Sequence, residues 1–340
     1  MLRLPNFELA RPSTLEEACA LLAEHGERAR VIAGGTDLLP NLKHGLYDVD
    51  LVVALGGIPG LADVEVQGHE LRIGALTPLE TVAASEDVRR HAPALAQAAS
   101  LVAGPQHRRM GTLGGNVMLD TRCQWINQTY FWRKALGFCL KKDGTLCHVV
   151  EGGKRCVAAA SNDSAPALMS VGAQLEFATP SGLRSLAIDD LWVPDGIDNK
   201  CNEPSEVLSA IRVPLRDAGH RGAYGKLRER GSIDFPLLGC AVRLEVDAGG
   251  LITEADLVLV ALQARPTRVK RVAELLAGKP SDGHELAEAI DEVARRAHKQ
   301  CKPLDNIPGD MEYRRRMIPV YVRRTLRAAL EGSGPVHHLG

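Results

Sequence analysis

A stretch of about forty residues, 121–160, limits the possible folds of this chain more than any other segment. It has no long amphipathic run, yet it carries two of the three tryptophans and four of the eight cysteines, Cys123, Cys139, Cys147 and Cys156. A loop of this length without regular structure is usually functional or disordered, and its aromatic content argues against disorder. We therefore expect a metal bound by the cysteines, rather than a hydrophobic core, to organise the segment.

The spacing of these cysteines does not identify which metal centre they hold. The pattern C-x15-C-x7-C-x8-C has no C-x2-C pair, which excludes the common zinc-ribbon and ferredoxin spacings. From the residues alone, an iron–sulfur cluster, a structural zinc ion and four unligated thiols all stay open. His148, beside Cys147, is either a further ligand or a neighbour. The dispersed cysteines are interpreted as small packed side chains: Cys19, Cys201, Cys240 and Cys301.

Two glycine-rich loops predict a site for a phosphate-bearing cofactor. Glycine allows a positive φ and a close backbone approach, so that successive N–H groups can surround an anion. Neither loop matches the G-x-G-x-x-G fingerprint or a P-loop, and a plain strand-to-helix turn is the alternative for the first. Two loops on successive segments favour a cofactor in the cleft between them. The first comprises Ala33, Gly34, Gly35, Thr36, Asp37, Leu38 and Leu39, and the second spans 111–116 with polar Thr112 and Asn116.

The order of expected elements predicts an α+β chain in three parts. Residues 1–57 alternate strand, helix and strand, which is typical of an α/β unit. Residues 58–220 form a second unit that contains the cysteine-rich insertion. Residues 221–331 run from long strands to amphipathic helices, as in an α+β domain, and 332–340 are a tail. On the last helix, residues 314–316 are expected to form a solvated or docking face.

Composition excludes several classes of protein. The 340 residues carry a formal net charge of -1, so no basic excess points to nucleic acid or an anionic membrane. No apolar run approaches the roughly 18–20 residues that span a bilayer. The N-terminus lacks the apolar core of a signal peptide, and we expect the cytoplasm.

Several motifs, taken together and in order, resemble a known family. AGGTDLL, the DLVVAL strand, the IPGL turn and LRIGALTPL resemble the FAD-binding medium subunits of the molybdenum hydroxylases, the family of xanthine and carbon monoxide dehydrogenases. GTLGGNV resembles their second flavin loop, and YGKLRER and YRRRM also fit. The resemblance implies two N-terminal α/β FAD-binding subdomains and a C-terminal α+β domain. It also implies partner subunits, a large one with the molybdenum cofactor and a small one with two [2Fe–2S] clusters.

The resemblance also assigns FAD contacts to positions of this chain. Residues 33–39 would meet the pyrophosphate and the ribityl chain. The remaining contacts would be Thr112, Gly115 and Asn116 on the other side of the diphosphate, Asp163 at polar hydroxyls, Leu208 and Lys226 beside the isoalloxazine, and Tyr224 as a cover of the ring. The subunit itself would transfer electrons, with no catalytic residue of its own.

The inserted segment departs from the ordinary family pattern. Ordinary members run almost directly from the second glycine loop to the aspartate, whereas this chain inserts about forty residues there. The insertion resembles that of the beta subunits of 4-hydroxybenzoyl-CoA reductases, in which four cysteines hold an extra [4Fe–4S] cluster. By this resemblance, the ligands would be Cys123, Cys139, Cys147 and Cys156.

The branch implies a direction of electron flow. Reduced ferredoxin would deliver electrons to the cluster, and FAD would pass them to the partner [2Fe–2S] clusters and molybdenum. The complex, a dimer of heterotrimers, would convert 4-hydroxybenzoyl-CoA to benzoyl-CoA in anaerobic aromatic degradation. Two alternatives stay open. One is the FAD subunit of an oxidative molybdenum hydroxylase acting on an N-heterocycle or an aldehyde, and the other is a zinc-stabilised binding module.

Overall fold

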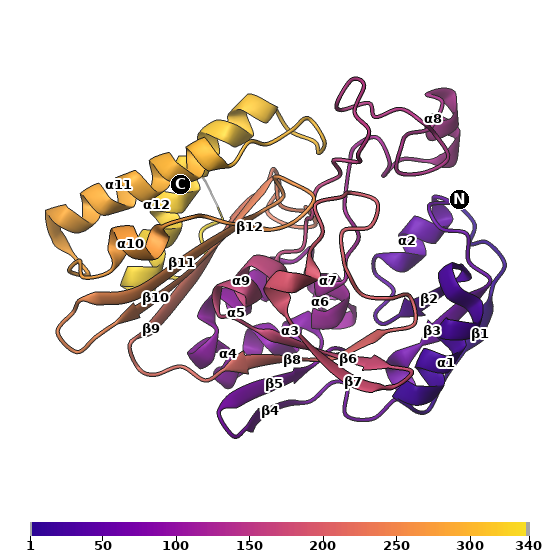
Figure 1. Cartoon of the computed structure of the whole chain (residues 1–340), viewed down its shortest axis with the longest axis horizontal. Coiled ribbons are helices and arrows are strands. Elements are labelled where there is room, and N and C mark those ends of the chain that lie inside the picture. The colour runs from indigo at the N-terminus through magenta and orange to yellow at the C-terminus, as the bar shows by residue number, and fades with distance from the viewer. Residues whose placement is uncertain (1, 338–340) are drawn as a thin grey trace.

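The computed structural model describes residues 2–337, which form three sheets with their own helices (Figure 1). The first part is a three-stranded parallel sheet of order β1-β3-β2. The side chains of Ala18, Cys19 and Leu22 on its first helix are buried in a small core, as expected for Cys19. The elements are β1 (Glu8–Ala10), α1 (Leu15–His25), β2 (Ala29–Ile32), α2 (Leu38–Lys43) and β3 (Leu51–Ala54).

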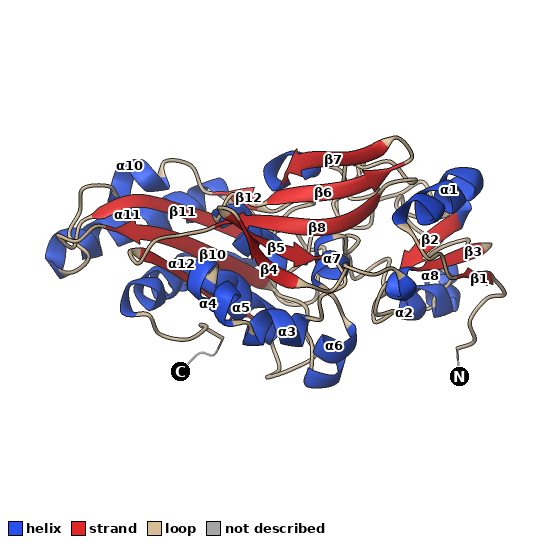
Figure 2. Cartoon of the chain, turned by 90° about the horizontal axis from the view of Figure 1, so that it is seen from below, coloured by secondary structure: helices blue, strands red, loops and turns tan. Residues whose placement is uncertain are grey.

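The second part is a five-stranded antiparallel sheet of order β4-β5-β8-β6-β7. Helices α3 to α6 gather on one side of it (Figure 2). Its strands are β4 (Val64–Gln67), β5 (Glu70–Gly74), β6 (Gln174–Thr179), β7 (Gly182–Ala187) and β8 (Val207–Pro214). Its helices are α3 (Leu79–Ala84), α4 (Glu86–His91), α5 (Pro93–Leu101), α6 (Pro105–Met110), α7 (Leu113–Val117) and α9 (Ser164–Ser170).

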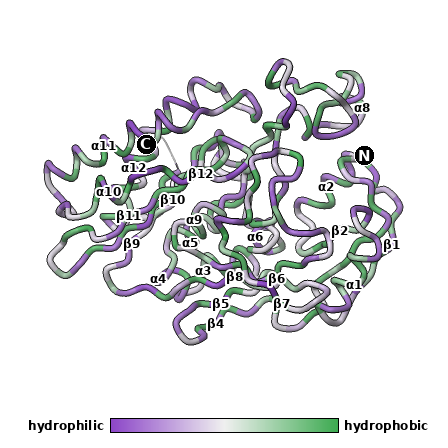
Figure 3. The backbone as a smooth tube through the Cα atoms, in the orientation of Figure 1, coloured by the Kyte–Doolittle hydropathy of each residue, from purple (hydrophilic) through white to green (hydrophobic). Residues whose placement is uncertain are grey.

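The third part is a four-stranded antiparallel sheet of order β12-β11-β10-β9, packed between α5 and α9 on one face and α12 on the other. Its elements are β9 (His220–Leu227), β10 (Leu238–Val246), β11 (Ile252–Val260), β12 (Thr267–Arg268), α10 (Val272–Leu276), α11 (Gly283–Gln300) and α12 (Met311–Glu331). Hydrophobic and hydrophilic residues alternate around α11 (Figure 3), which is typical of a helix with one buried face.

The terminal helix corrects one expectation from the sequence. Arg314 is fully buried rather than solvated, and its guanidinium donates to the carbonyl oxygens of Leu237, Leu304 and Ala261 at 3.1, 2.8 and 2.6 Å. Burial lowers the pKa of Arg314 to about 10. The side chain satisfies carbonyl groups of three loops, so it anchors α12 to the third sheet.

The inserted segment projects from the second part toward the first. Its one helix is the short α8 (Tyr130–Ala135), which lies beside α2 (Figure 1). A backbone bridge between Arg122 and Ala159 closes the base of the insertion. Within residues 2–337, no helix is long and apolar enough to cross a membrane.

Candidate functional site

A cleft of about 1180 Å³ runs between the parts of the chain. Its walls come from the loop after β2, the start of α7, the base of the insertion, the segment 197–208 and the loop between β9 and β10. This volume exceeds the range of about 300–1,000 Å³ that is typical of small-ligand pockets, so it suits an extended cofactor.

The two glycine loops meet at one end of the cleft. A Cβ on Gly34 would overlap the carbonyl oxygen of Met110, the residue just before the second loop. Gly35 has φ +70°, a conformation that favours glycine. The chain therefore brings backbone from both loops close together, as a phosphate cradle requires.

The second loop begins a short helix whose polar side chains are already engaged. The hydroxyl of Thr112 accepts a hydrogen bond from the backbone N–H of Gly115 at 3.1 Å. The Oδ1 atom of Asn116 accepts from the backbone N–H of Ser164 at 3.0 Å and thereby links α7 to α9. Thr112, Gly115 and Asn116 all line the cleft, and the side chains of Thr112 and Asn116 form part of its wall.

The first-loop side chains divide between the cleft and the core. Asp37 lines the cleft and accepts from Arg122 at 2.7 Å and from Asn41 at 2.9 Å. Burial raises the pKa of Asp37, and the guanidinium of Arg122 opposes that rise. Leu38 also lines the cleft, whereas Leu39 packs into the small core beneath α2.

Asp163 lies at the start of α9 and forms the polar floor of the cleft. Its carboxylate accepts from the hydroxyl of Tyr224 at 2.8 Å and from the ammonium of Lys226 at 2.9 Å. Lys226 also donates to the carbonyl of Leu101 at 2.9 Å. Burial raises the pKa of Asp163 and lowers that of Lys226, and the attraction between the two charges opposes both shifts.

The structure corrects the expected role of Tyr224. Its side chain has no exposed surface and lies in the core, so it cannot cover a ring bound in the cleft. Lys226 is equally buried beneath Asp163, whereas Leu208 does line the cleft. Tyr224 and Lys226 therefore support Asp163 from below.

Several cleft residues were missed in the sequence, among them two apolar ones. Ile233 and Phe235, on the loop between β9 and β10, line the cleft with 56% and 41% of their surfaces exposed. The Ile233 N–H donates to the carbonyl of Ala103 at 3.0 Å, and the guanidinium of Arg122 lies 4.1 Å from the Phe235 ring centroid. The one sign of them in the sequence is a pair of apolar residues inside the otherwise polar turn GSIDFP. So short a turn has no hydrophobic periodicity that would identify the pair.

All four clustered cysteines line one small cavity of about 20 Å³ in the insertion. Burial, and then the neighbouring thiols, raise the pKa of Cys123 to about 12. His148 also lines the cavity, but its Nε2 atom lies 2.6 Å from the Phe138 carbonyl oxygen. In the described part of the chain, no three His, Cys, Asp or Glu side chains are spaced to hold a metal ion. Four thiols on one cavity are the donor set that soft metals and iron–sulfur clusters take.

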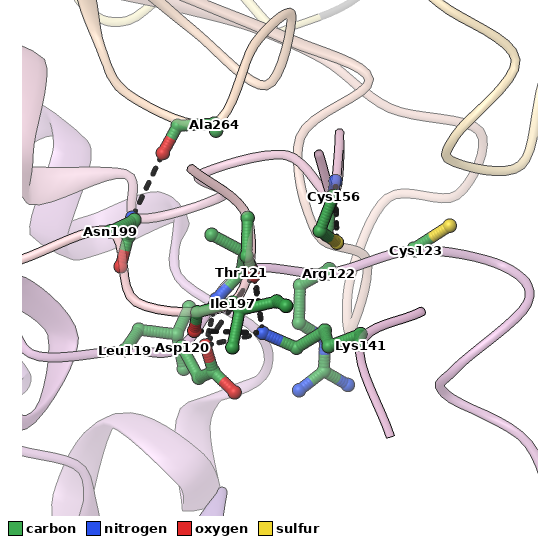
Figure 4. A network of polar contacts seen from close by, with 12 residues as sticks. Leu119, Asp120, Thr121, Arg122, Cys123, Lys141, Cys156, Ile197, Asn199 and Ala264 are labelled. Carbon is green, nitrogen blue, oxygen red and sulfur yellow. Dashed lines mark hydrogen bonds and ion pairs between the residues drawn. The ribbon is translucent and has the colours of Figure 1, made fainter. Parts of the chain in front are cut away.

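A polar network joins this cavity to the cleft (Figure 4). The ammonium of Lys141 donates to Asp120 Oδ1 at 2.9 Å and to Thr121 Oγ1 at 2.8 Å. Tyr47 donates to the other oxygen of Asp120 at 3.0 Å. Burial alone would raise the pKa of Asp120. The ammonium groups of Lys141 and Lys200 favour its ionised form and outweigh burial, so the pKa is lowered.

Family models match nearly the whole chain. Residues 5–216 match the FAD binding domain in molybdopterin dehydrogenase, and residues 223–329 match the CO dehydrogenase flavoprotein C-terminal domain. The chain belongs to this family. It is an FAD-binding subunit of the molybdenum hydroxylase family of oxidoreductases, and the predicted α+β fold is confirmed.

Individual relatives match most or nearly all of the chain. The carbon monoxide dehydrogenase medium chain of Afipia carboxidovorans is 29% identical over 95% of this chain and 96% of that protein. The aldehyde oxidoreductase FAD-binding subunit of Escherichia coli is 32% identical over 72% of this chain and 80% of that protein. The carbon monoxide dehydrogenase structure from Hydrogenophaga pseudoflava superimposes with a TM-score of 0.79 and 27% identity, covering 98% of this chain and 100% of that chain.

Proposed function

We propose that this chain is the FAD and [4Fe–4S] electron-transfer subunit of a molybdenum-containing 4-hydroxybenzoyl-CoA reductase. The observation that carries the proposal is the convergence of Cys123, Cys139, Cys147 and Cys156 on one cavity beside the cofactor cleft. Four thiolates are the ligand set of such a cluster, and a separate segment of chain between the second glycine loop and Asp163 provides them.

The volume of the cleft and the chemistry of its residues support FAD as the cofactor. Backbone N–H groups of the two glycine loops would bind the diphosphate, with Thr112 and Asn116 keeping the second loop in place. Asp163 would bind a polar group of the cofactor while Lys226 balances its charge. Leu208, Ile233 and Phe235 would exclude water from the apolar part. When bound, FAD supplies exchange of one or two electrons.

We propose partner subunits on the basis of the relatives. The named carbon monoxide dehydrogenase medium chains suggest a large subunit with molybdenum and a small subunit with [2Fe–2S] clusters. We propose ferredoxin as the electron donor and a dimer of heterotrimers as the assembly. Removing the phenolic hydroxyl of 4-hydroxybenzoyl-CoA as water consumes two electrons and two protons, so the complex needs a reductant.

The insertion has the surface expected of a docking site for an acidic donor protein. Segment 121–160 contains seven Lys and Arg residues against two Asp and Glu residues. Of the seven cations, Lys134, Lys154 and Arg155 are exposed. Phe131 and Leu146 expose 79% and 67% of their surfaces there. Opposite charges speed the encounter of two proteins, and exposed apolar groups add contact area.

The second candidate is an oxidative molybdenum hydroxylase. The names of relatives favour it, because they include nicotine 6-hydroxylase, xanthine dehydrogenase and aldehyde oxidoreductase subunits. In that case the cysteines would hold zinc or stay unligated, and electrons would leave through the flavin. A zinc-stabilised binding module without flavin is a third reading, which the family membership disfavours.

Cofactor analysis of the anaerobically purified complex tests the proposal. We expect one FAD, about four irons and about four sulfides on this chain. On the separated chain, Cys139→Ser should lose most of the iron, whereas Cys201→Ser, a cysteine outside the insertion, should keep all of it. Zinc without sulfide would overturn the cluster and favour the oxidative enzyme.

Turnover then separates the two enzymes. The reductase should form benzoyl-CoA from 4-hydroxybenzoyl-CoA with reduced ferredoxin. Oxidation of an aldehyde or N-heterocycle, with no product from 4-hydroxybenzoyl-CoA, would contradict the reductase.

A further inference from the structure

The cofactor cleft and the cysteine cavity share part of one wall. In the described part of the chain, Ile126 and Lys141 are the residues that line both spaces. Ile126 is apolar, so Lys141 is the one charged side chain common to the two cavities. Figure 4 shows it between Asp120, on the side of the cleft, and Cys156, on the side of the thiols.

The ammonium of Lys141 is held in place by several acceptors. It donates to Asp120 Oδ1 at 2.9 Å, to Thr121 Oγ1 at 2.8 Å and to the carbonyl oxygen of Gly196 at 2.5 Å. Its side chain is 9% exposed. A cation with so little exposure is weakly screened by water, while the Asp120 carboxylate at 2.9 Å offsets part of its field on the cleft side.

Gly196 connects this cation to the thiols. Its N–H donates to the carbonyl of Cys156 at 3.0 Å, and a Cβ at this position would lie 2.8 Å from the Cys156 sulfur. No side chain therefore separates the carbonyl that binds Lys141 from the sulfur. On the other side, Asp120 and Tyr47 line the cleft. Asp120 accepts hydrogen bonds from Tyr47 and from Lys141, so these bonds connect the wall of the cleft to the wall of the cysteine cavity.

Three neighbouring cations, unlike Lys141, do not line the cysteine cavity. Lys142 pairs with Asp48 near the surface, and Arg122 pairs with Asp37 in the first glycine loop. Lys200 donates to the carbonyl oxygen of Leu119 and to the side-chain oxygen of Asn199, and it lines the cleft but not the cysteine cavity.

We infer that Lys141 is a positioning residue whose fixed charge raises the reduction potentials of both the cysteine-bound centre and the flavin. Reduction adds negative charge, and a nearby cation stabilises the reduced form more than the oxidised form. This inference rests on the proposed function for the identity of the two centres.

Redox titration of the purified complex tests the inference. The variant Lys141→Met removes the charge and keeps an apolar stem of similar length, and Lys141→Arg restores the charge. Lys134→Met removes an exposed lysine of the same insertion and is the matched control. Iron, sulfide and FAD are assayed first. The midpoint potentials are then read from flavin absorption and from the paramagnetic signal of the reduced cysteine-bound centre.

We expect full cofactor content and lower midpoint potentials of both centres in Lys141→Met, near-normal potentials in Lys141→Arg, and no change in Lys134→Met. Unchanged potentials in Lys141→Met would overturn the inference. An equal shift in Lys141→Arg would also overturn it, because position rather than charge would then matter. Loss of FAD or metal from Lys141→Met alone would show a structural anchor and overturn it as well. If this chain, separated from the wild-type complex, contains no iron, the proposed function fails separately, and the flavin potential still decides the role of Lys141.

Discussion

Gly34 and Gly114 bring neighbouring backbone segments into contact at the cofactor cleft. A Cβ on Gly34 would overlap the Met110 carbonyl, and one on Gly114 would lie 2.7 Å from the Ala75 carbonyl oxygen. Both obstacles are backbone atoms, which cannot move aside without displacing the loop or strand that carries them. These glycines are needed because of close approach rather than flexibility.

Replacing Gly34 with alanine should therefore push the two glycine loops apart. We expect a loss of roughly 1–3 kcal/mol in unfolding free energy, typical of overpacking, together with a large fall in bound FAD. Flavin absorbance per protein and denaturant unfolding measure the two effects. Gly56→Ala is the control, since a Cβ there meets nothing within 4 Å. A Gly34→Ala protein with full flavin content would contradict this account of the loop.

Lys200 predicts a pH dependence of stability. Burial lowers its pKa from 10.5 to about 8. Between these two values the unfolded chain binds more protons than the folded chain, so stability rises with pH in this window. We expect the unfolding free energy of the wild type, relative to Lys200→Met, to increase by about 2 kcal/mol from pH 8 to pH 10.5, which is less than the full shift because the residue keeps some exposure. Chemical denaturation at several pH values measures it, and a constant difference would refute it.

At the scale of elements, α8 depends on one buried arginine. Arg133 is 1% exposed, and its Nη2 atom donates to the carbonyls of His44 and Gly45 at 3.0 Å each, at the end of α2. Its guanidinium also lies 5.8 Å from the ring centroids of Tyr130 and Phe138. The side chain therefore fastens the insertion to the first part of the chain.

Arg133→Ala should increase the local opening of the insertion without loss of FAD from the cleft. The two carbonyls would lose a donor, at a cost of about 1–3 kcal/mol, so amide exchange over residues 130–147 should accelerate roughly tenfold or more. Hydrogen exchange with mass spectrometry measures it. Lys134→Ala, next in the chain but exposed, should leave the rate unchanged. Equal protection in the two variants would show that α8 is held by other contacts.

The elements themselves were well predicted where periodicity is strong. The long strands and amphipathic helices of the third part and the strand–helix–strand order of the first part appear as expected. Arg314 was misjudged because a run of three arginines looks solvated in the sequence. Its burial depends on carbonyls from Leu237, Leu304 and Ala261, which no local pattern reveals.

At the scale of the whole molecule, the cleft draws its walls from all three parts of the chain. A ligand that binds only this folded arrangement stabilises it by mass action, by about 2.7 kcal/mol at a hundredfold excess over Kd.

Removing FAD should therefore lower the melting temperature by a few degrees, and adding it back should restore the value. Thermal unfolding of the apoprotein, the reconstituted protein and the Gly34→Ala variant measures this. Identical melting temperatures with and without FAD, at saturating concentration, would show that the cofactor binds without coupling to the interface between the parts.

The sequence by itself determined the family, the α+β class, the two glycine loops and the segment that carries the cysteines. These features are encoded locally, in residue type, spacing and periodicity, so they can be recognised without coordinates. Only the tertiary structure decided that Tyr224 and Lys226 lie beneath Asp163, that Ile233 and Phe235 face the cleft, and that Lys141 borders both cavities. Those relations join residues far apart in the chain, and the direction of each side chain depends on how the sheets and loops pack.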